Sequence, residues 1–210
     1  MRTPLGGGTI VSAYLIDRIV VRLGVVFERL PFTPNQVTLM SAAVGVAAGI
    51  LFIFDQWLAG AISVFASMEL DGLDGEVARR KNMKSKYGAF LDTMMDRVVD
   101  TTVVLGVAYS SAKIYGDTAW IIGFLAAVYA CVLSSYTRKL VAIATGTEPT
   151  WLDEKPKFTD GRDVRLLIIT LGALGNLFVD WSALASVAIV LALSLSKFVI
   201  RLFIYRDKLE

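Results

Sequence analysis

The part of this sequence most able to do chemistry is a stretch of 26 residues that contains four aspartates. It covers residues 71–96 and reads DGLDGEVARRKNMKSKYGAFLDTMMD. Its spacing is D-x2-D-G-x2-A-R-x8-G-x3-D-x3-D, with the fixed positions Asp71, Asp74, Gly75, Ala78, Arg79, Gly88, Asp92 and Asp96. Clustered carboxylates bind hard divalent cations, and a pair of such cations is an arrangement that diphosphate chemistry uses.

Helical periodicity predicts which of these side chains face one another. At about 100° per residue, two carboxylates and two small residues share one side of the first helix: Asp71, Asp74, Gly75 and Ala78. On the second helix, residues four apart form a stripe of Gly88, Asp92, Asp96 and Asp100. The small residues on these faces would let a ligand approach the backbone closely beside the carboxylates.

A short turn over residues 82–86 predicts that the two helices are antiparallel neighbours, so that the carboxylates meet in two layers. Such a cluster could not stay ionised unaided in a low-dielectric surrounding. We therefore predict two Mg²⁺ or Mn²⁺ ions, held by Asp71, Asp74, Asp92 and Asp96. Glu69 and Glu76 point to the back of the first helix and are excluded as ligands.

Composition indicates an integral membrane protein. Of the 210 residues, 55% are hydrophobic, which is more than an ordinary soluble domain contains. Histidine is absent and Cys131 is the single cysteine, so metal binding and proton transfer fall to carboxylates. The formal net charge of +2 is small, and we expect no nucleic-acid partner. The first thirty residues show no signal-peptide pattern.

The expected fold is all-α, with six transmembrane helices preceded by an amphipathic interfacial helix. Residues 1–9 are interpreted as a flexible tail or the end of a linker, because they contain Pro4 and a run of glycines. Residues 10–30 have the pattern of an amphipathic helix, lying in the membrane interface or packed on protein. Residues 31–210 form the membrane catalytic domain, with spans predicted at 37–54, 57–81, 87–111, 119–144, 164–178 and 181–205.

Basic residues predict the orientation of these spans. Of the 21 Lys and Arg residues, only Lys113 falls beside the short connections on one side. By the positive-inside rule, the other side is cytoplasmic and includes both termini. We therefore predict a multi-pass cell-membrane protein whose acidic stretch opens to the cytoplasm.

At residues 71–96 the sequence resembles the CDP-alcohol phosphotransferases, also called CDP-alcohol phosphatidyltransferases, whose signature is the spacing given above. All eight fixed positions match. The predicted helices and the Thr33-Pro34-Asn35 entry to the first span are also similar to the family, so the resemblance covers essentially the whole chain. It implies a phospholipid-type biosynthetic enzyme that works in the lipid bilayer, commonly as a homodimer.

The resemblance implies transfer of a substituted phosphate group from a CDP-alcohol to an acceptor hydroxyl, with release of CMP. The donor would be CDP-diacylglycerol or an archaeal ether-lipid counterpart. Carried over by position, Asp71, Asp74 and Asp92 bind the metals, and Asp96 binds metal and acts as general base. The nucleotide-binding positions would be Gly75, Ala78, Arg79 and Gly88.

Basic residues outside the motif are candidates for the acceptor site. The Ser-Tyr-x-Arg run that ends at Arg138, and Arg165 near the start of the fifth span, resemble the branch whose acceptor is inositol phosphate. After Arg138 the sequence departs from that branch at residues 139–141. Guanidinium groups suit a phosphate because they can bind it bidentately. The predicted acceptor-binding residues are Arg138, Arg162, Arg165 and Arg201, with snorkelling to the membrane surface as the alternative.

Other functions share some of these features. The glycine tail and the residues before Tyr14 also resemble archaeal inositol phosphodiester synthases, which would use soluble CDP-inositol as donor. An intramembrane prenyltransferase uses aspartates and Mg²⁺, but with two motifs far apart in sequence. A divalent-cation transporter would account for intramembrane carboxylates, yet not for the small residues on their face.

Overall fold

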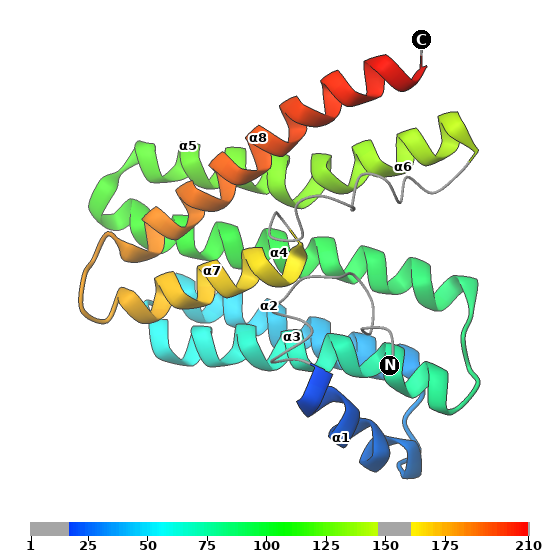
Figure 1. The fold of residues 1–210 in the computed structure, drawn as a ribbon. Helices are drawn as coiled ribbons and strands as arrows, with labels where there is room; N and C mark the ends of the chain where they lie inside the picture. Colours follow the sequence, from blue (N-terminus) through cyan, green and yellow to red (C-terminus); the bar gives the residue numbers. More distant parts are fainter. Residues whose placement is uncertain (1–16, 147–160, 210) are drawn as a thin grey trace.

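The computed structural model describes residues 17–146 and 161–209, and these are almost entirely helical. In chain order the elements are α1 (Asp17–Arg29), α2 (Pro34–Ile53), α3 (Trp57–Arg80), α4 (Lys86–Tyr115), α5 (Asp117–Ala126), the π-helix η2 (Ala127–Leu133), α6 (Ser134–Thr145), α7 (Arg162–Gly175) and α8 (Ser182–Leu209). The long helices run roughly along one another in an elongated bundle, with α1 lying outside α3 (Figure 1). The all-α fold class is therefore confirmed.

The predicted helices are present with small shifts at their ends. The first three predicted spans correspond to α2, α3 and α4, and the last two to α7 and α8. The span predicted over 119–144 is instead divided into α5, η2 and α6. The amphipathic helix predicted over 10–30 is described from Asp17 onward as α1, and the predicted tail at 1–9 lies outside the described residues.

Two of the described helices are long and apolar enough to cross a membrane by themselves, over Pro34–Ile53 and Ser182–Phe203. The apolar run Asp117–Leu133 is shorter. Charged residues interrupt α3 and α4, so these helices do not pass a test of apolarity although they are long. Six membrane spans and an interfacial α1 therefore stay predictions.

Caps fix where two helices beside the acidic stretch begin. Thr33 forms a capping box at the start of α2, in which its hydroxyl accepts from the Gln36 amide and its own amide donates to Gln36 Oε1 at 2.9 Å. At the start of α4, the Ser85 hydroxyl accepts a hydrogen bond from the Gly88 amide at 2.9 Å. The turn over residues 81–85 thus ends sharply and sends α4 back alongside the bundle.

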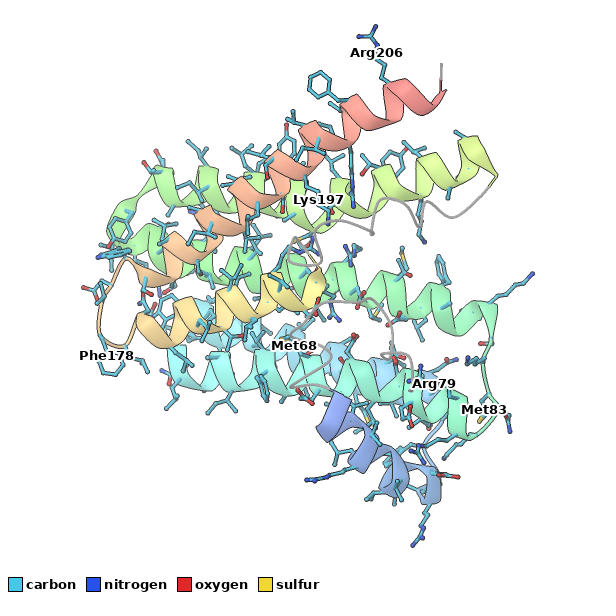
Figure 2. All side chains as sticks on the ribbon, viewed as in Figure 1. Met68, Arg79, Met83, Phe178, Lys197 and Arg206 are labelled. Carbon is cyan, nitrogen blue, oxygen red and sulfur yellow. The ribbon has the colours of Figure 1, made fainter. Side chains whose placement is uncertain are left out.

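At the opposite end of the bundle, polar contacts join the α2–α3 turn to the last turns of α4. Lys113 Nζ lies 2.7 Å from Asp55 Oδ2, and the Ser110 hydroxyl also donates to Asp55. The hydrogen bond from Lys113, followed by that from Ser110, lowers the pKa of the Asp55 carboxyl. Figure 2 shows Phe178 at this end of the molecule and Met83 at the other, near the α3–α4 turn.

Helix α2 is the centre of the packing around the acidic helices. It packs closely against both α3 and α4, whereas α3 and α4 make at most marginal direct contact with each other. The approach of α2 to α4 depends on small residues, because a Cβ on Gly49 would lie 2.6 Å from the carbonyl oxygen of Thr102. On the other side of this contact, a Cβ on Gly106 would collide with the carbonyl oxygen of Gly49. The two carboxylate-bearing helices are therefore held by their shared neighbour α2.

This packing predicts that Gly49→Leu destabilises the fold by about 1–3 kcal/mol or more, because a larger side chain must push α2 away from α4. The midpoint of thermal unfolding in detergent micelles measures the effect. Ala47→Leu is the matched control, because Ala47 lies on an exposed side of the same helix and should tolerate the change. Equal unfolding midpoints for the two variants would contradict the close α2–α4 contact.

Candidate active site

Three of the predicted metal ligands converge between α3 and α4. Asp71, Asp92 and Asp96 each offer one carboxylate oxygen, and these oxygens lie within 4.8 Å of one another. All three side chains are half-buried. Asp92 and Asp96 share one face of α4 because they are four residues apart. Grouped carboxylate oxygens fit a hard divalent cation such as Mg²⁺ or Mn²⁺.

Asp74, the fourth predicted ligand, lies outside this group of three. It is 8% exposed and accepts a hydrogen bond from the hydroxyl of Thr38 on α2. Thr38 also donates to the carbonyl oxygen of Pro34 at 3.2 Å. Thr38 was missed at the level of sequence, because one threonine in an apolar helix gives no signal. The hydrogen bond ties the second motif aspartate to the central helix of the bundle.

Arg162, the first residue of α7, lies against the group of Asp71, Asp92 and Asp96, which we call the acidic cluster. Its Nη1 atom lies 2.6 Å from Asp71 Oδ2 and 2.9 Å from Asp96 Oδ1, and so links the two acidic helices. The second contact is an ion pair without hydrogen-bond geometry, since Asp96 Oδ1 has no hydrogen-bond partner among the described residues. This residue was predicted to bind the acceptor, and the structure places it directly against two of the metal-ligand candidates.

Asp100 is a further carboxylate of the site, one turn beyond Asp96 on α4. It is 2% exposed, and its two oxygens face two arginines of α7. Oδ1 lies 3.0 Å from Arg162 Nε, and Oδ2 lies 3.3 Å from Arg165 Nη2. Helical spacing predicted that Asp100 shares a face of α4 with Asp92 and Asp96. Its contacts with Arg162 and Arg165 could be seen only in the folded chain.

Arginines from three helices donate to carbonyl oxygens at or just after η2. Arg97 Nη1 donates to the carbonyl oxygen of Cys131 at 2.8 Å. Arg165 Nη1 donates to the carbonyl oxygen of Ala130 at 2.7 Å. Arg201 Nη1 donates to the carbonyl oxygen of Ser134 at 2.6 Å. A π-helical turn departs from the regular α-helical hydrogen-bond ladder and is often found at functional sites.

Two of the four predicted acceptor residues, Arg165 and Arg201, are thus fixed beside this segment. The backbone of Arg138 belongs to α6, but its side chain lies outside the described residues.

The predicted nucleotide-binding residues fall into two groups. Gly75 is open, since among residues 17–146 and 161–209 the only side-chain atom near a Cβ placed there is Arg79 Nη1 at 3.6 Å. Ala78 is half-buried on the same helix, and Arg79 pairs with Glu76 at 2.9 Å. Figure 2 shows Arg79 at the same end of the bundle as Met83. Gly88 instead lies at the start of α4, where its amide donates to Ser85 and a Cβ would lie 3.1 Å from Asn35 Oδ1.

The two glutamates excluded as ligands have different surroundings. Glu76 accepts from Arg79 and also from Arg80, whose Nε lies 2.7 Å from Glu76 Oε1. The first pair ties Glu76 to a motif residue, although Glu76 itself lies outside the group of three carboxylates. Glu69 is 7% exposed, and within the described part of the chain neither of its carboxylate oxygens has a hydrogen-bond partner.

A family model described as CDP-alcohol phosphatidyltransferase matches residues 32–196. The chain belongs to this family. The match confirms the resemblance carried by residues 71–96, and it extends from α2 through α7 into the first half of α8. Family membership argues against the prenyltransferase and the cation transporter as alternatives.

Curated CDP-alcohol phosphatidyltransferase relatives differ in how much of their length the chain spans. It is 28% identical over 190 residues to archaetidylinositol phosphate synthase from Pyrococcus horikoshii, covering 90% of this chain and 92% of that protein. It is 29% identical over 192 residues to a bifunctional IPC transferase and DIPP synthase from Aquifex aeolicus, covering 89% of this chain. The chain spans 41% of the length of that bifunctional protein.

A solved structure has the same fold. The crystal structure of Mycobacterium tuberculosis phosphatidylinositol phosphate synthase with CDP-DAG bound matches with a TM-score of 0.74 and 26% sequence identity. The match covers 89% of this chain and 92% of that one.

The cluster predicts that Asp92→Asn weakens Mn²⁺ binding by about tenfold or more, since loss of an outer-shell partner alone already lowers metal affinity by about 10–100-fold. Electron paramagnetic resonance of free Mn²⁺ during a titration of the detergent-purified protein gives the affinity. Asp55→Asn makes the same replacement at the far end of the bundle and is the control. Unchanged Mn²⁺ affinity in Asp92→Asn would refute the assignment of the cluster.

Proposed function

We propose that this chain transfers a lipid-linked phosphate group from a CDP-alcohol to the hydroxyl of an inositol phosphate and releases CMP. The observation that carries the proposal is the position of Arg162. Its guanidinium lies 2.9 Å from Asp96, the proposed base, and 2.6 Å from Asp71, a proposed metal ligand. A phosphate-bearing acceptor held by this arginine would therefore have its hydroxyl beside both groups.

The donor end of the site consists of the motif on α3 and α4. Asp71, Asp92 and Asp96 would hold Mg²⁺ or Mn²⁺, and a bound cation would neutralise the charge of the CDP diphosphate. A second ion is part of the proposal, with the buried Asp74 as its additional ligand. The open face at Gly75 and the neighbouring Ala78 leave room for the cytidine nucleotide. The mycobacterial neighbour has been crystallised with CDP-DAG bound, which supports a CDP-alcohol donor.

Asp96 is the proposed general base. Its Oδ1 atom lies 2.9 Å from Arg162 Nη1, so a phosphate-bearing acceptor that binds Arg162 would bring its hydroxyl to this carboxylate. In the proposed step, the acceptor oxygen forms a bond to the β-phosphorus of the donor as the bond from that phosphorus to the CMP oxygen breaks. The proton passes to Asp96, and CMP leaves with the bonding electrons.

The acceptor end consists of arginines that lie outside the motif. Arg162 and Arg165 are one turn apart on α7, and both contact Asp100. Together they would bind a phosphate through charge-assisted hydrogen bonds, with Arg138 and Arg201 as further candidates. The Pyrococcus relative is named as an archaetidylinositol phosphate synthase and the mycobacterial one as a phosphatidylinositol phosphate synthase. Both names support an inositol phosphate as acceptor here.

A second donor is favoured by the bifunctional relatives. The Aquifex protein is named for DIPP synthesis, and this chain is 29% identical to it over 192 residues. The chain spans 41% of that protein, and soluble CDP-inositol is the second candidate donor, to be tested beside the lipid donors.

The proposed setting is a lipid bilayer, with the active site and both chain ends on the cytoplasmic side and the chain forming a homodimer. Many large apolar side chains of the bundle are exposed, among them Ile62, Ile121 and Phe203. Burial of these side chains in lipid would remove an apolar surface that water would otherwise contact.

If the proposed function is right, the protein in liposomes with Mg²⁺ or Mn²⁺ should release CMP from CDP-diacylglycerol or CDP-archaeol when inositol 1-phosphate is added. Free inositol and glycerol 3-phosphate serve as comparison acceptors, and CDP-inositol as the comparison donor. EDTA should abolish release and added metal should restore it. Release that is equally fast with free inositol would contradict the phosphate-bearing acceptor.

The assignment of the base predicts that Asp96→Asn lowers kcat by about 100-fold or more, since general base catalysis contributes on that scale. Binding of the CDP-alcohol, measured by calorimetry in the presence of metal, should change much less. A kcat close to that of the unchanged protein would show that another group takes the proton.

A further inference from the structure

Asp100 combines three properties that the family motif does not explain. It lies outside residues 71–96, it is only 2% exposed, and its two carboxylate oxygens each face a different arginine of α7. Arg97, on the same helix, lies further away, with its Nη2 atom 3.9 Å from Asp100 Oδ2. A buried carboxylate shared between arginines is strongly held, because water does not screen the pair.

The contact with Arg162 sets the direction of that side chain. Asp100 Oδ1 holds Nε, the nitrogen nearest the aliphatic stem, at 3.0 Å. Because the guanidinium group is planar and rigid, a fixed Nε directs its outer nitrogens, and Nη1 reaches Asp71 and Asp96. Asp100 thus determines where the charged end of Arg162 lies relative to the acidic cluster.

The contact with Arg165 has a second anchor. Arg165 Nη2 lies 3.3 Å from Asp100 Oδ2, while Nη1 donates to the carbonyl oxygen of Ala130 in η2 at 2.7 Å. Two different nitrogens are therefore fixed by two different elements, and Arg165 is 5% exposed. Asp100 thus contacts both arginines, which project from successive turns of α7.

Asp100 differs from the motif aspartates in the kind of partner that it has. It is absent from the group of carboxylates that could hold a cation, which contains Asp71, Asp92 and Asp96. Both of its oxygens are already paired with guanidinium nitrogens. Its chemistry therefore concerns the arginines and not the metal.

We propose that Asp100 is a positioning residue for the acceptor: it holds Arg162 and Arg165 in the orientation that binds the phosphate of the acceptor beside the acidic cluster. The proposal rests on the function proposed above, because it takes the acceptor to carry a phosphate. The competing interpretation is that Asp100 only neutralises buried positive charge, in which case its loss would destabilise the protein without changing the affinity for one substrate selectively.

The test is Asp100→Asn, which keeps the size of the side chain and removes its charge. With a saturating CDP-alcohol donor in liposomes, the KM for inositol 1-phosphate should rise about tenfold or more, the scale of a lost hydrogen bond to a charged group. The donor KM and the Mn²⁺ affinity should stay within about twofold of the unchanged protein. Asp55→Asn, which breaks an aspartate–lysine pair at the far end of the bundle, should change none of the three.

A double-mutant cycle shows whether Asp100 acts through its partners. If it does, Asp100→Asn combined with Arg165→Ala should raise the acceptor KM by clearly less than the product of the two single effects. Any of three results would overturn the positioning role. These are a double-mutant rise in acceptor KM equal to the full product of the two single rises, an acceptor KM that Asp100→Asn leaves unchanged, and a donor KM that rises as much as the acceptor KM. Should Asp100→Asn not fold, Asp100→Glu keeps the charge but moves it by one methylene, and it must still raise the acceptor KM.

Binding of inorganic phosphate separates failure of this inference from failure of the proposed function. If the protein turns over only acceptors that lack phosphate, the proposed function is wrong in its acceptor. Calorimetric titration of the metal-loaded protein with inorganic phosphate then decides on Asp100 alone. Binding that Asp100→Asn weakens about tenfold supports the positioning role; binding that is equal in both proteins, or absent from the unchanged protein, overturns it.

Discussion

The structure depends on the pairing of charges inside an apolar bundle of helices. An unpaired carboxylate or guanidinium in such surroundings is strongly disfavoured, which favours pairing with a group of opposite charge. Arg162 pairs with Asp71 and Asp96, and Asp100 pairs with both Arg162 and Arg165. These pairs join α3, α4 and α7. The position of α7 in the bundle is therefore set by the ion pairs at its first turn as well as by its apolar face.

Helix α2 provides the apolar counterpart of this charged network. It packs on both α3 and α4, which make at most marginal direct contact, and its glycine contact with α4 fixes how closely the two helices approach. The Thr38 hydroxyl on the same helix donates to Asp74. One helix thus sets the spacing of the acidic helices and orients a carboxylate between them. A change in the apolar α2–α4 packing would move Asp92 and Asp96 relative to Asp71, although no charged residue had changed.

The sequence was sufficient for features that follow from helical phase. Asp71 could be assigned to one face of α3, and Asp92 and Asp96 to one face of α4, because residues at such spacing must lie on one side of a helix. The fold class and the approximate ends of the helices followed from apolar periodicity and from caps such as Thr33. What could not be predicted depends on contacts between elements. The Thr38–Asp74 bond, the entry of Arg162 into the cluster and the π-helical turn of η2 arise only when distant segments pack together.

The features that helical phase predicts belong to the donor side of the proposed reaction, and those that need contacts between elements belong mainly to its acceptor side. The donor-side residues lie within 26 consecutive positions, and their mutual geometry is fixed by two helices and one short turn. The acceptor-side arginines whose side chains the structure describes come from α7 and α8, and they contact Asp100 or carbonyl oxygens at η2. The donor side is therefore local in the sequence and the acceptor side is not, although Asp100 shares α4 with Asp92 and Asp96. For this reason a local motif was enough to predict the family, whereas the nature of the acceptor had to be inferred from contacts that only the folded chain makes.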